Sequence, residues 1–339
     1  MVTKDRQAES GLVPTHPKQE ASLVPYIDYG KQKGQGLVLV NMGGRTGWFV
    51  RRLFPVLSTQ IYLLHLRLTK TKATWRRFNT LKDARPLQWF THIEVETFNR
   101  CNGTCSFCPV NRVADPRKPA KMTERLFASV VDQLAEVDYT GYFGLFSNNE
   151  PLLDSRLQAF ASEARQRLPH AFFNLMTNGT LLDVDGFKHL MRNFDRLVID
   201  NYNNQPQMHP NVQEIYSFCR TLEGERLLRG KTVEISLRNR QDVLSTRAGQ
   251  SPNKRPPSRP LKLPCVLPYL QFVVRPDGKV SLCCNDALGE MTLGDLTRQC
   301  ISEVWHGDGF ADVRTRMAAH GRKGVALCSR CDFTKIDVV

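Results

Sequence analysis

The chain has 339 residues, 41% of them hydrophobic, which is enough for one large domain and a smaller one. Its 47 Lys and Arg against 33 Asp and Glu give a net charge of +14. A basic chain can bind nucleic acid, but there is no nucleic-acid motif and no interleaved aromatic and basic array, so we expect no nucleic-acid partner. The ten cysteines have short local spacings, which indicate metal ligands and a reducing compartment and argue against a secreted disulfide framework.

The first 90 residues are predicted to precede the main domain. Residues 1–35 are rich in polar residues, Pro and Gly and are expected to form a flexible tail. They lack an early apolar run, so we predict no signal peptide and a cytoplasmic location. Residues 36–90 form a basic extension, with a predicted strand at Gly36–Met42.

Within this extension, Trp48–Phe78 carries seven basic residues and no acidic one. The pattern favours one or two helices packed on the body of the protein; contact with a membrane surface is the alternative. No apolar stretch reaches the ~18 residues that span a bilayer.

From residue 91 to 262 the pattern alternates between strand and helix. The predicted strands are His92–Phe98, Tyr142–Ser147, Ala171–Met176, Arg196–Asp200 and Val233–Leu237. The predicted helices are Lys121–Val137, Ser155–Leu168, Val184–Phe194 and Val212–Arg229, the first with Thr123 as its N-cap. Alternating βα units of this length predict a parallel sheet, whose ligands lie at the carboxyl ends of the strands.

The most informative stretch follows the first of these strands. Cys101, Cys105 and Cys108 have the spacing C-x3-C-x2-C, and Gly103 lets the loop wrap tightly. Three thiolates can hold three corners of a cubane iron–sulfur cluster and leave the fourth iron open to an outside ligand, as catalytic metal sites do. A zinc loop is the alternative, although zinc loops more often use C-x2-C pairs.

This loop resembles the signature of the radical S-adenosylmethionine (SAM) superfamily. The resemblance implies a [4Fe–4S] cluster that binds SAM on its open iron and cleaves it to a 5′-deoxyadenosyl radical. It also implies a partial (β/α)6 TIM-like barrel over residues 91–262, and it places Phe107 near the adenine of SAM.

Further residues are expected around SAM. In the family, a Gly-Gly-Glu-Pro motif after the second strand contacts the SAM amino group, and here the sequence is Asn148-Asn149-Glu150-Pro151. The resemblance therefore assigns Asn149 and Glu150 to cofactor binding, with the backbone role weakened by the loss of both glycines. Asn178 and Asp200 are assigned by position, because they follow or end the third and fourth strands.

A connector rich in Pro and basic residues spans Gln241–Pro264. Arg247 within it belongs to an Arg-Ala-Gly stretch that resembles one found before the second domain of related enzymes. It is the candidate catalytic residue, since it could bind a substrate hydroxyl or phosphate. The alternative is a surface or structural arginine of a basic linker.

A second group of cysteines follows the connector. Leu270–Val274 and Lys279–Cys283 are predicted strands joined by Pro276-Asp277-Gly278, a hairpin signal that brings Cys265 close to Cys283. Ile301–Ala319 is a predicted helix that leads to the closing C-x2-C. The four candidate ligands are Cys265, Cys283, Cys328 and Cys331.

These four cysteines can saturate a metal or a cluster. The layout resembles the twitch form of the SPASM domain, which implies an auxiliary [4Fe–4S] cluster in residues 263–339. A structural zinc site with the same ligands is the alternative. Cys283 is preferred to its neighbour Cys284 because adjacent strand residues point to opposite faces. The remaining cysteines are predicted to be unligated: Cys219, Cys284 and Cys300.

The overall layout is most similar to that of a radical SAM aminocyclitol dehydrogenase. This implies oxidation of a sugar-like or cyclitol alcohol to a ketone, with one electron passing to the auxiliary cluster. The expected partners are a small-molecule substrate, sugar-like or anionic, and a flavodoxin or ferredoxin as electron donor. The alternatives are radical modification of a ribosomal peptide and a non-catalytic electron-transfer or metal-binding protein.

Overall fold

The computed structural model describes residues 71–84, 87–205 and 207–334. Their strands form one sheet in the order β5-β4-β3-β2-β1-β6-β7-β8, parallel from β5 to β6. The strands are β1 His92–Val95, β2 Tyr142–Gly144, β3 Phe172–Thr177, β4 Arg196–Asn203, β5 Thr232–Asn239, β6 Gln271–Val274, β7 Lys279–Ser281 and β8 Thr292–Asp295. The predicted parallel sheet of alternating βα units is confirmed.

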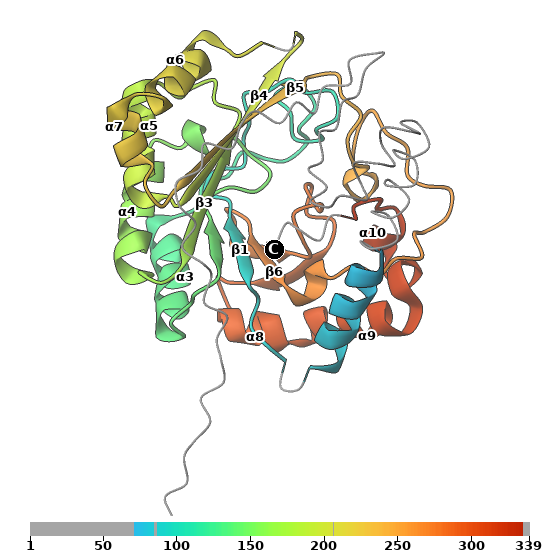
Figure 1. The fold of residues 1–339 in the computed structure, drawn as a ribbon. Coiled ribbons are helices and arrows are strands. Elements are labelled where there is room, and N and C mark those ends of the chain that lie inside the picture. Colours follow the sequence, from blue (N-terminus) through green and yellow to red (C-terminus); the bar gives the residue numbers. More distant parts are fainter. Residues whose placement is uncertain (1–70, 85–86, 206, 335–339) are drawn as a thin grey trace, which may run out of the picture.

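The helices between the first five strands cover the outer face of this sheet (Figure 1). They are α3 Glu124–Glu136, α4 Leu157–Arg167, α5 Val184–Asn193, α6 Pro210–Cys219 and α7 Leu222–Leu227. The predicted cap of α3 is confirmed, since Thr123 Oγ1 accepts a hydrogen bond from the Leu126 amide at 3.2 Å. This bond satisfies one of the free N–H groups at the start of the helix.

The prediction of one helix over Val212–Arg229 was wrong. Helix α6 ends at Cys219, and Thr221 Oγ1 then accepts a hydrogen bond from the Gly224 amide at 3.1 Å, which begins α7. Threonine competes for backbone hydrogen bonds inside a helix and is favoured at its start, so the chain begins a second helix here.

The predicted helix Ile301–Ala319 is likewise two helices, α8 Ile301–His306 and α9 Asp308–His320. Gly307 lies between them with an extended backbone at φ −75° and ψ 173°. A Cβ atom on this residue would lie 2.3 Å from the Glu303 carbonyl oxygen, so the close turn requires glycine. A short helix, α10 Ala326–Ser329, carries the start of the closing C-x2-C.

The sixth parallel strand comes from beyond the predicted end of the barrel. Strand β6 pairs with β1 over the whole register from His92↔Gln271 to Val95↔Val274. It then turns antiparallel into β7 through the predicted hairpin, where Gly278 has a positive φ of 81° and donates to the Arg275 carbonyl at 2.9 Å. The sheet thus continues across residues 262–263, and the barrel and the auxiliary segment share it.

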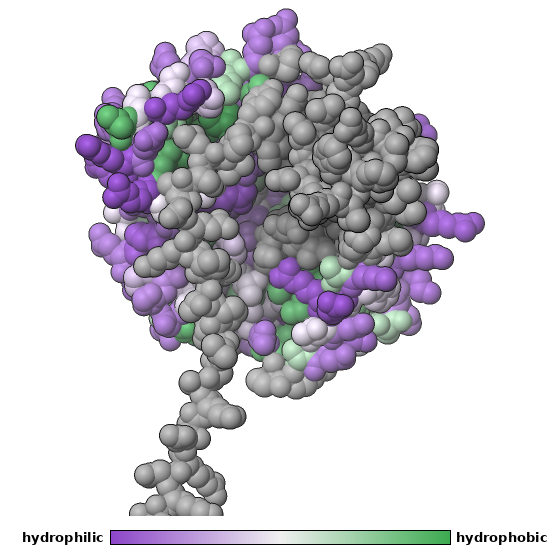
Figure 2. Space-filling model, in the orientation of Figure 1, coloured by the Kyte–Doolittle hydropathy of each residue, from purple (hydrophilic) through white to green (hydrophobic). Residues whose placement is uncertain are grey.

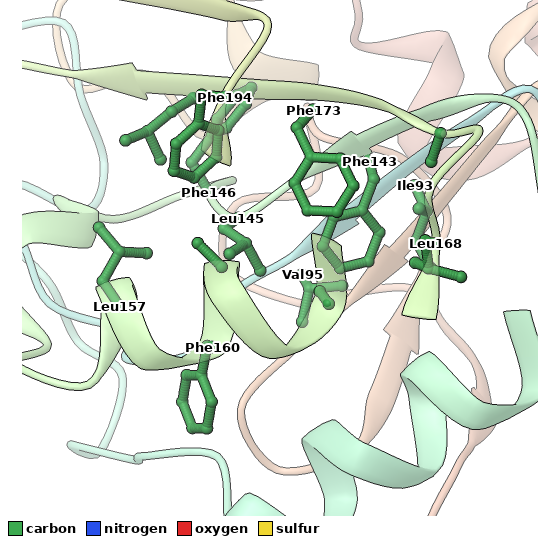
Figure 3. Packing of buried hydrophobic residues seen from close by; sticks show 14 of the residues in the cluster. Ile93, Val95, Phe143, Leu145, Phe146, Leu157, Phe160, Leu168, Phe173 and Phe194 are labelled. Carbon is green, nitrogen blue, oxygen red and sulfur yellow. The ribbon is translucent and has the colours of Figure 1, made fainter. Parts of the chain in front are cut away.

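The main hydrophobic core lies between the sheet and its helices (Figure 3). Ile93, Phe143 and Phe173 are fully buried there on three adjacent strands. Each such side chain contributes at most about 2–3 kcal/mol by leaving water. Because alternate residues of a strand face opposite sides, His92 and Glu94 point away from this core into the interior of the barrel.

A second hydrophobic cluster lies in the auxiliary segment and includes a helix over residues 71–83. Phe78 on this helix is buried, and its ring packs edge-on against Tyr269 at a centroid distance of 5.7 Å. The preference for a helix packed on the body is thus confirmed for residues 71–78. The predicted tail 1–35, the strand Gly36–Met42 and the rest of the extension up to residue 70 lie outside the described residues.

The described part of the surface is largely hydrophilic on the face shown in Figure 2. Its exposed large hydrophobic residues are Trp75, Val113, Val137, Leu181, Leu222 and Val243. None of the helices in the described ranges is both long enough and apolar enough to cross a membrane.

Candidate active site and cysteine clusters

The three-cysteine loop begins a few residues after β1, at the carboxyl end of the sheet. Asn111 holds it closed, since its Nδ2 donates to the carbonyl oxygens of Cys105 at 3.2 Å and Cys108 at 2.8 Å. The Gly103 amide lies 3.3 Å from Cys101 Sγ, so the backbone already solvates this sulfur. The loop is therefore folded around its three thiols by its own backbone.

Arg117 anchors the loop to the barrel. Its guanidinium donates to Glu96 at 3.0 Å and to the carbonyl oxygens of Asn99 and Asn148 at 2.9 Å each. It also forms an ion pair with Asp115 at 3.0 Å. Burial raises the pKa of Glu96 to about 7, although Arg117 acts against this shift. Sequence analysis missed Arg117 because no local spacing links it to partners as far away as Asn148.

A cavity of about 470 Å³ opens beside the loop. Its wall includes all three loop cysteines. Every other residue proposed for this site lines it as well: Phe107, Asn149, Glu150, Asn178, Asp200 and Arg247. Sequence analysis therefore selected residues that the fold brings together, and their individual roles stay predictions.

Glu150 joins two loops at the floor of this cavity. It is 1% exposed and accepts hydrogen bonds from Thr177 Oγ1 at 2.6 Å, the Asn178 amide at 2.7 Å and the Leu152 amide at 3.1 Å. Burial raises its pKa, and these hydrogen bonds lower it. Because the carboxylate is shared among three protein donors, it positions the ends of β2 and β3 besides facing the cavity.

Asn178 and Asp200 lie on the same wall. Asn178 Nδ2 lies 4.0 Å from Cys101 Sγ and donates to Asn102 Oδ1 at 2.7 Å, so it touches the cysteine loop. Asp200 is paired with Arg238 Nε at 2.8 Å. Burial raises the pKa of Asp200 despite this arginine. Asp200 is thus a partly neutralised carboxylate, whereas Asn178 is the side chain closer to the thiols.

Arg247 reaches the cavity from a strained turn. The consecutive residues Arg247, Ala248 and Gly249 have positive φ values of 47°, 54° and 87°. Two non-glycine residues in this conformation cost free energy that the surroundings must offset. Asn148 Oδ1 accepts from Arg247 Nη2 at 2.5 Å, and Asp332 Oδ1 accepts from the Thr246 amide at 2.7 Å.

The four candidate auxiliary ligands are buried together in the second hydrophobic cluster: Cys265, Cys283, Cys328 and Cys331. Burial and the other cysteines raise the pKa of Cys283 well above its ordinary value. Cys284 differs from this group, since its amide donates to Gln271 Oε1 at 3.0 Å and its charged neighbours include Glu94 and Arg247. Cys284 thus packs against the second cluster from outside and also lies near barrel residues, whereas Cys283 is buried within the cluster, which favours Cys283 as the ligand.

The other two cysteines lie at helix ends. Cys219 is fully buried in the main hydrophobic core at the end of α6. Cys300 Sγ accepts from the Glu303 amide at 3.4 Å as the N-cap of α8. That these two thiols are unligated stays a prediction.

The donor set fits iron–sulfur clusters. Burial raises the pKa of Cys101 and of Cys105 to about 12, so the thiolates form readily only where positive metal charge offsets the burial. In the described ranges, no three Cys, His, Asp or Glu side chains converge on a single ion. A cubane cluster requires a different arrangement of the thiolates, because each thiolate binds a separate iron.

Comparisons with known proteins agree with this geometry. Residues 95–238 match the family model of the radical SAM superfamily, and residues 265–332 match the SPASM iron–sulfur cluster-binding domain. A similar curated protein is the S-adenosyl-L-methionine-dependent 2-deoxy-scyllo-inosamine dehydrogenase of Niallia circulans. It is 27% identical over 249 residues, which cover 73% of this chain and 94% of that protein.

Two solved structures have the same fold. BtrN in complex with AdoMet and 2-DOIA superposes with a TM-score of 0.62 at 27% identity, over 73% of this chain and 94% of that one. BtrN in an open conformation gives a TM-score of 0.52 at 23% identity over the same shares. The chain is a radical SAM superfamily enzyme whose C-terminal part is a SPASM auxiliary-cluster domain.

Proposed function

We propose that this enzyme oxidises a hydroxyl group of a small sugar-like or cyclitol substrate to a ketone. The observation that carries the proposal is a single cavity that the three-cysteine loop and Arg247 line together, while the turn of Arg247 is tied to the second cysteine group. A [4Fe–4S] cluster on Cys101, Cys105 and Cys108, with SAM on its open iron, supplies the electron and the 5′-deoxyadenosyl radical when bound.

The protein's own residues would orient SAM in this cavity. Phe107 packs against Tyr202 at a ring-centroid distance of 5.5 Å, which provides an apolar wall for the adenine. Asn149 Nδ2 is buried without a hydrogen-bond partner among the described residues, so it is available to a ligand acceptor. These contacts support the predicted cofactor-binding roles of Phe107 and Asn149.

The connector joins the two cysteine groups. Ser251 Oγ donates to the Phe107 carbonyl at 3.0 Å, and Asn253 Nδ2 donates to Ser106 Oγ at 3.0 Å. On the auxiliary side, Gln250 Nε2 donates to Asp286 Oδ1 at 3.1 Å. A short, hydrogen-bonded stretch of chain thus links the loop that would bind SAM to the segment that would hold the second cluster, and this supports electron transfer between them.

The size and charge of the cavity bear on the substrate and the partners. A volume of about 470 Å³ lies in the range of small-molecule sites, which favours a small substrate over a peptide. Arg112, Arg240 and Arg247 line it, so an anionic group on the substrate would be accommodated. We propose an acidic flavodoxin or ferredoxin as electron donor for a chain of net charge +14, and a cytoplasmic location because the clusters need reduced thiols.

The test is anaerobic reconstitution followed by turnover. Two four-iron clusters predict about eight irons per chain, and the variant with Ala at Cys101, Cys105 and Cys108 should retain about four. With reductant, SAM and 2-deoxy-scyllo-inosamine as the probe, mass spectrometry should detect 5′-deoxyadenosine and a ketone in equal amounts. Formation of 5′-deoxyadenosine without any ketone would contradict the proposed oxidation.

A further inference from the structure

A buried carboxylate lies inside the barrel, next to the cavity but not part of its wall. Glu94 on β1 is 3% exposed. Ser147 Oγ lies 2.6 Å from its Oε2, while Gln271 Nε2 at 2.9 Å and His92 Nε2 at 3.2 Å meet its Oε1. The Ser147 hydroxyl and the Gln271 side-chain amide donate to this carboxyl group, and His92 Nε2 is its third neighbour.

A structural role alone does not explain why a carboxyl group is buried at this position. Its three partners are the Ser147 hydroxyl after β2, the Gln271 amide on β6 and the His92 imidazole on β1. A buried carboxyl group is unfavourable unless hydrogen bonds or an opposite charge compensate for its lost hydration, and here all of its partners come from side chains inside the barrel. On the outer face of the same strand, Ile93 and Val95 achieve burial with apolar side chains. The buried carboxyl group of Glu94 is therefore a candidate for a chemical role.

Ser147 connects Glu94 to the cavity. Ser147 lines the cavity, and its hydroxyl hydrogen is directed at Glu94. Its oxygen also accepts from Asn148 Nδ2 at 3.2 Å. A hydroxyl has one donor and two acceptor positions, so one acceptor position of Ser147 is left for a group inside the cavity. Arg247 holds Asn148 from the other side and so fixes this geometry.

We propose that Glu94 accepts, through Ser147, the proton that the substrate alcohol loses. The inference rests on the proposed function. The carbon-bound hydrogen atom goes to the 5′-deoxyadenosyl radical, which leaves a carbon radical that still bears its hydroxyl. The O–H bond then breaks as its proton moves to Ser147 Oγ and the Ser147 hydrogen moves to Glu94 Oε2. The electron released as the C=O bond forms would be accepted by an oxidised iron–sulfur cluster, which Cys265, Cys283, Cys328 and Cys331 would hold.

In this scheme Ser147 touches the substrate, and Glu94 acts through it. His92 and Gln271 lie within hydrogen-bond distance of the other carboxyl oxygen, Oε1, so Oε2 is the oxygen that faces Ser147. Proton transfer by a positioned group of this kind typically contributes 10²–10⁴-fold to a rate.

The first experiment needs neither cluster nor substrate. Infrared difference spectra of the cluster-free protein and its Glu94→Gln variant at pH 7 should show the loss of an ionised carboxylate band. Loss of a protonated carboxyl C=O stretch instead would overturn the proposal, because a carboxyl that already holds its proton cannot accept another.

The second experiment measures coupling in the reconstituted enzyme with 2-deoxy-scyllo-inosamine as the probe. Glu94→Gln should still form 5′-deoxyadenosine, with ketone formation slowed about 100-fold and an organic radical accumulating in the EPR spectrum. Ser147→Ala should behave in the same way, and Ser147→Thr, which keeps the hydroxyl, should restore coupling. Iron content and melting temperature serve as folding controls.

The outcomes separate the two proposals. Wild-type protein that yields 5′-deoxyadenosine without ketone, or neither product, overturns the proposed function and the proton transfer with it. Wild-type protein that yields both, while Glu94→Gln keeps the same product ratio, overturns only the role of Glu94.

Discussion

Arg117 offers a direct test of how the three-cysteine loop is held. Its guanidinium joins Glu96 on one side to the carbonyl oxygens of Asn99 and Asn148 on the other. The Arg117→Met variant keeps an unbranched side chain but removes every donor, and it leaves Glu96, which is 1% exposed, without its ion-pair partner. Removing one member of a buried pair costs about 3–5 kcal/mol, so we expect the free energy of unfolding to fall by that amount.

A double variant separates the lost ion pair from lost packing. Glu96→Gln removes the buried charge, so Arg117→Met combined with Glu96→Gln should lose at least about 1 kcal/mol less than the sum of the two single variants. Arg125→Met, on the exposed side of α3, is the matched control and should change stability by no more than about 0.5 kcal/mol. Urea unfolding of the cluster-free protein, followed by circular dichroism, measures all four. A loss below about 1 kcal/mol for Arg117→Met would refute this account of the loop.

Three further predictions concern a titrating acid, a ligand and a helix cap. Burial raises the pKa of Glu96 from its ordinary value of 4.5 to about 7 in the folded protein, so its contribution to stability is present below pH 4.5 and is lost as pH rises to about 7. Unfolding midpoints measured from pH 4 to 8 should show this decline, of about 3 kcal/mol, in wild type and not in Glu96→Gln. Cys283→Ser should lose about four irons per chain while Cys284→Ser retains about eight, and the reverse result would make Cys284 the ligand. Thr123→Ala should lower the free energy of unfolding by about 1 kcal/mol through loss of the α3 cap, and an unchanged denaturation midpoint would contradict that role.

Local patterns predicted most of the elements correctly. The period of hydrophobic residues located the strands and helices of the barrel, and Thr123 located the start of α3. These signals depend only on residues that are neighbours in the sequence. The same is true of the turn at Gly278 and of the two cysteine groups. The two errors, at Thr221 and Gly307, are places where the helical pattern continues in sequence while a cap or a close carbonyl ends the helix.

The candidate site was predictable in its membership but not in its connections. Resemblance to a family motif identified Glu150, and strand-end positions identified Asn178 and Asp200, because parallel strands bring their carboxyl ends together. Nothing in the sequence indicated that Glu150 is already shared among three protein donors, or that Arg238 neutralises Asp200. Such pairings depend on which strands are adjacent in the sheet, and the order of the strands in the sheet cannot be read from the sequence.

The amino-acid sequence alone determined the chemistry that this protein can carry. The three thiols that leave one iron open are close together in the sequence, so their spacing can be recognised without the tertiary structure. The tertiary structure decided what surrounds that chemistry. It took the sixth parallel strand from the auxiliary segment, buried Cys283 within the second cluster while Cys284 stays partly exposed against it, and placed Glu94 behind Ser147. These features depend on contacts between residues that are far apart in sequence, and only the packing of the whole sheet brings such residues within hydrogen-bonding distance.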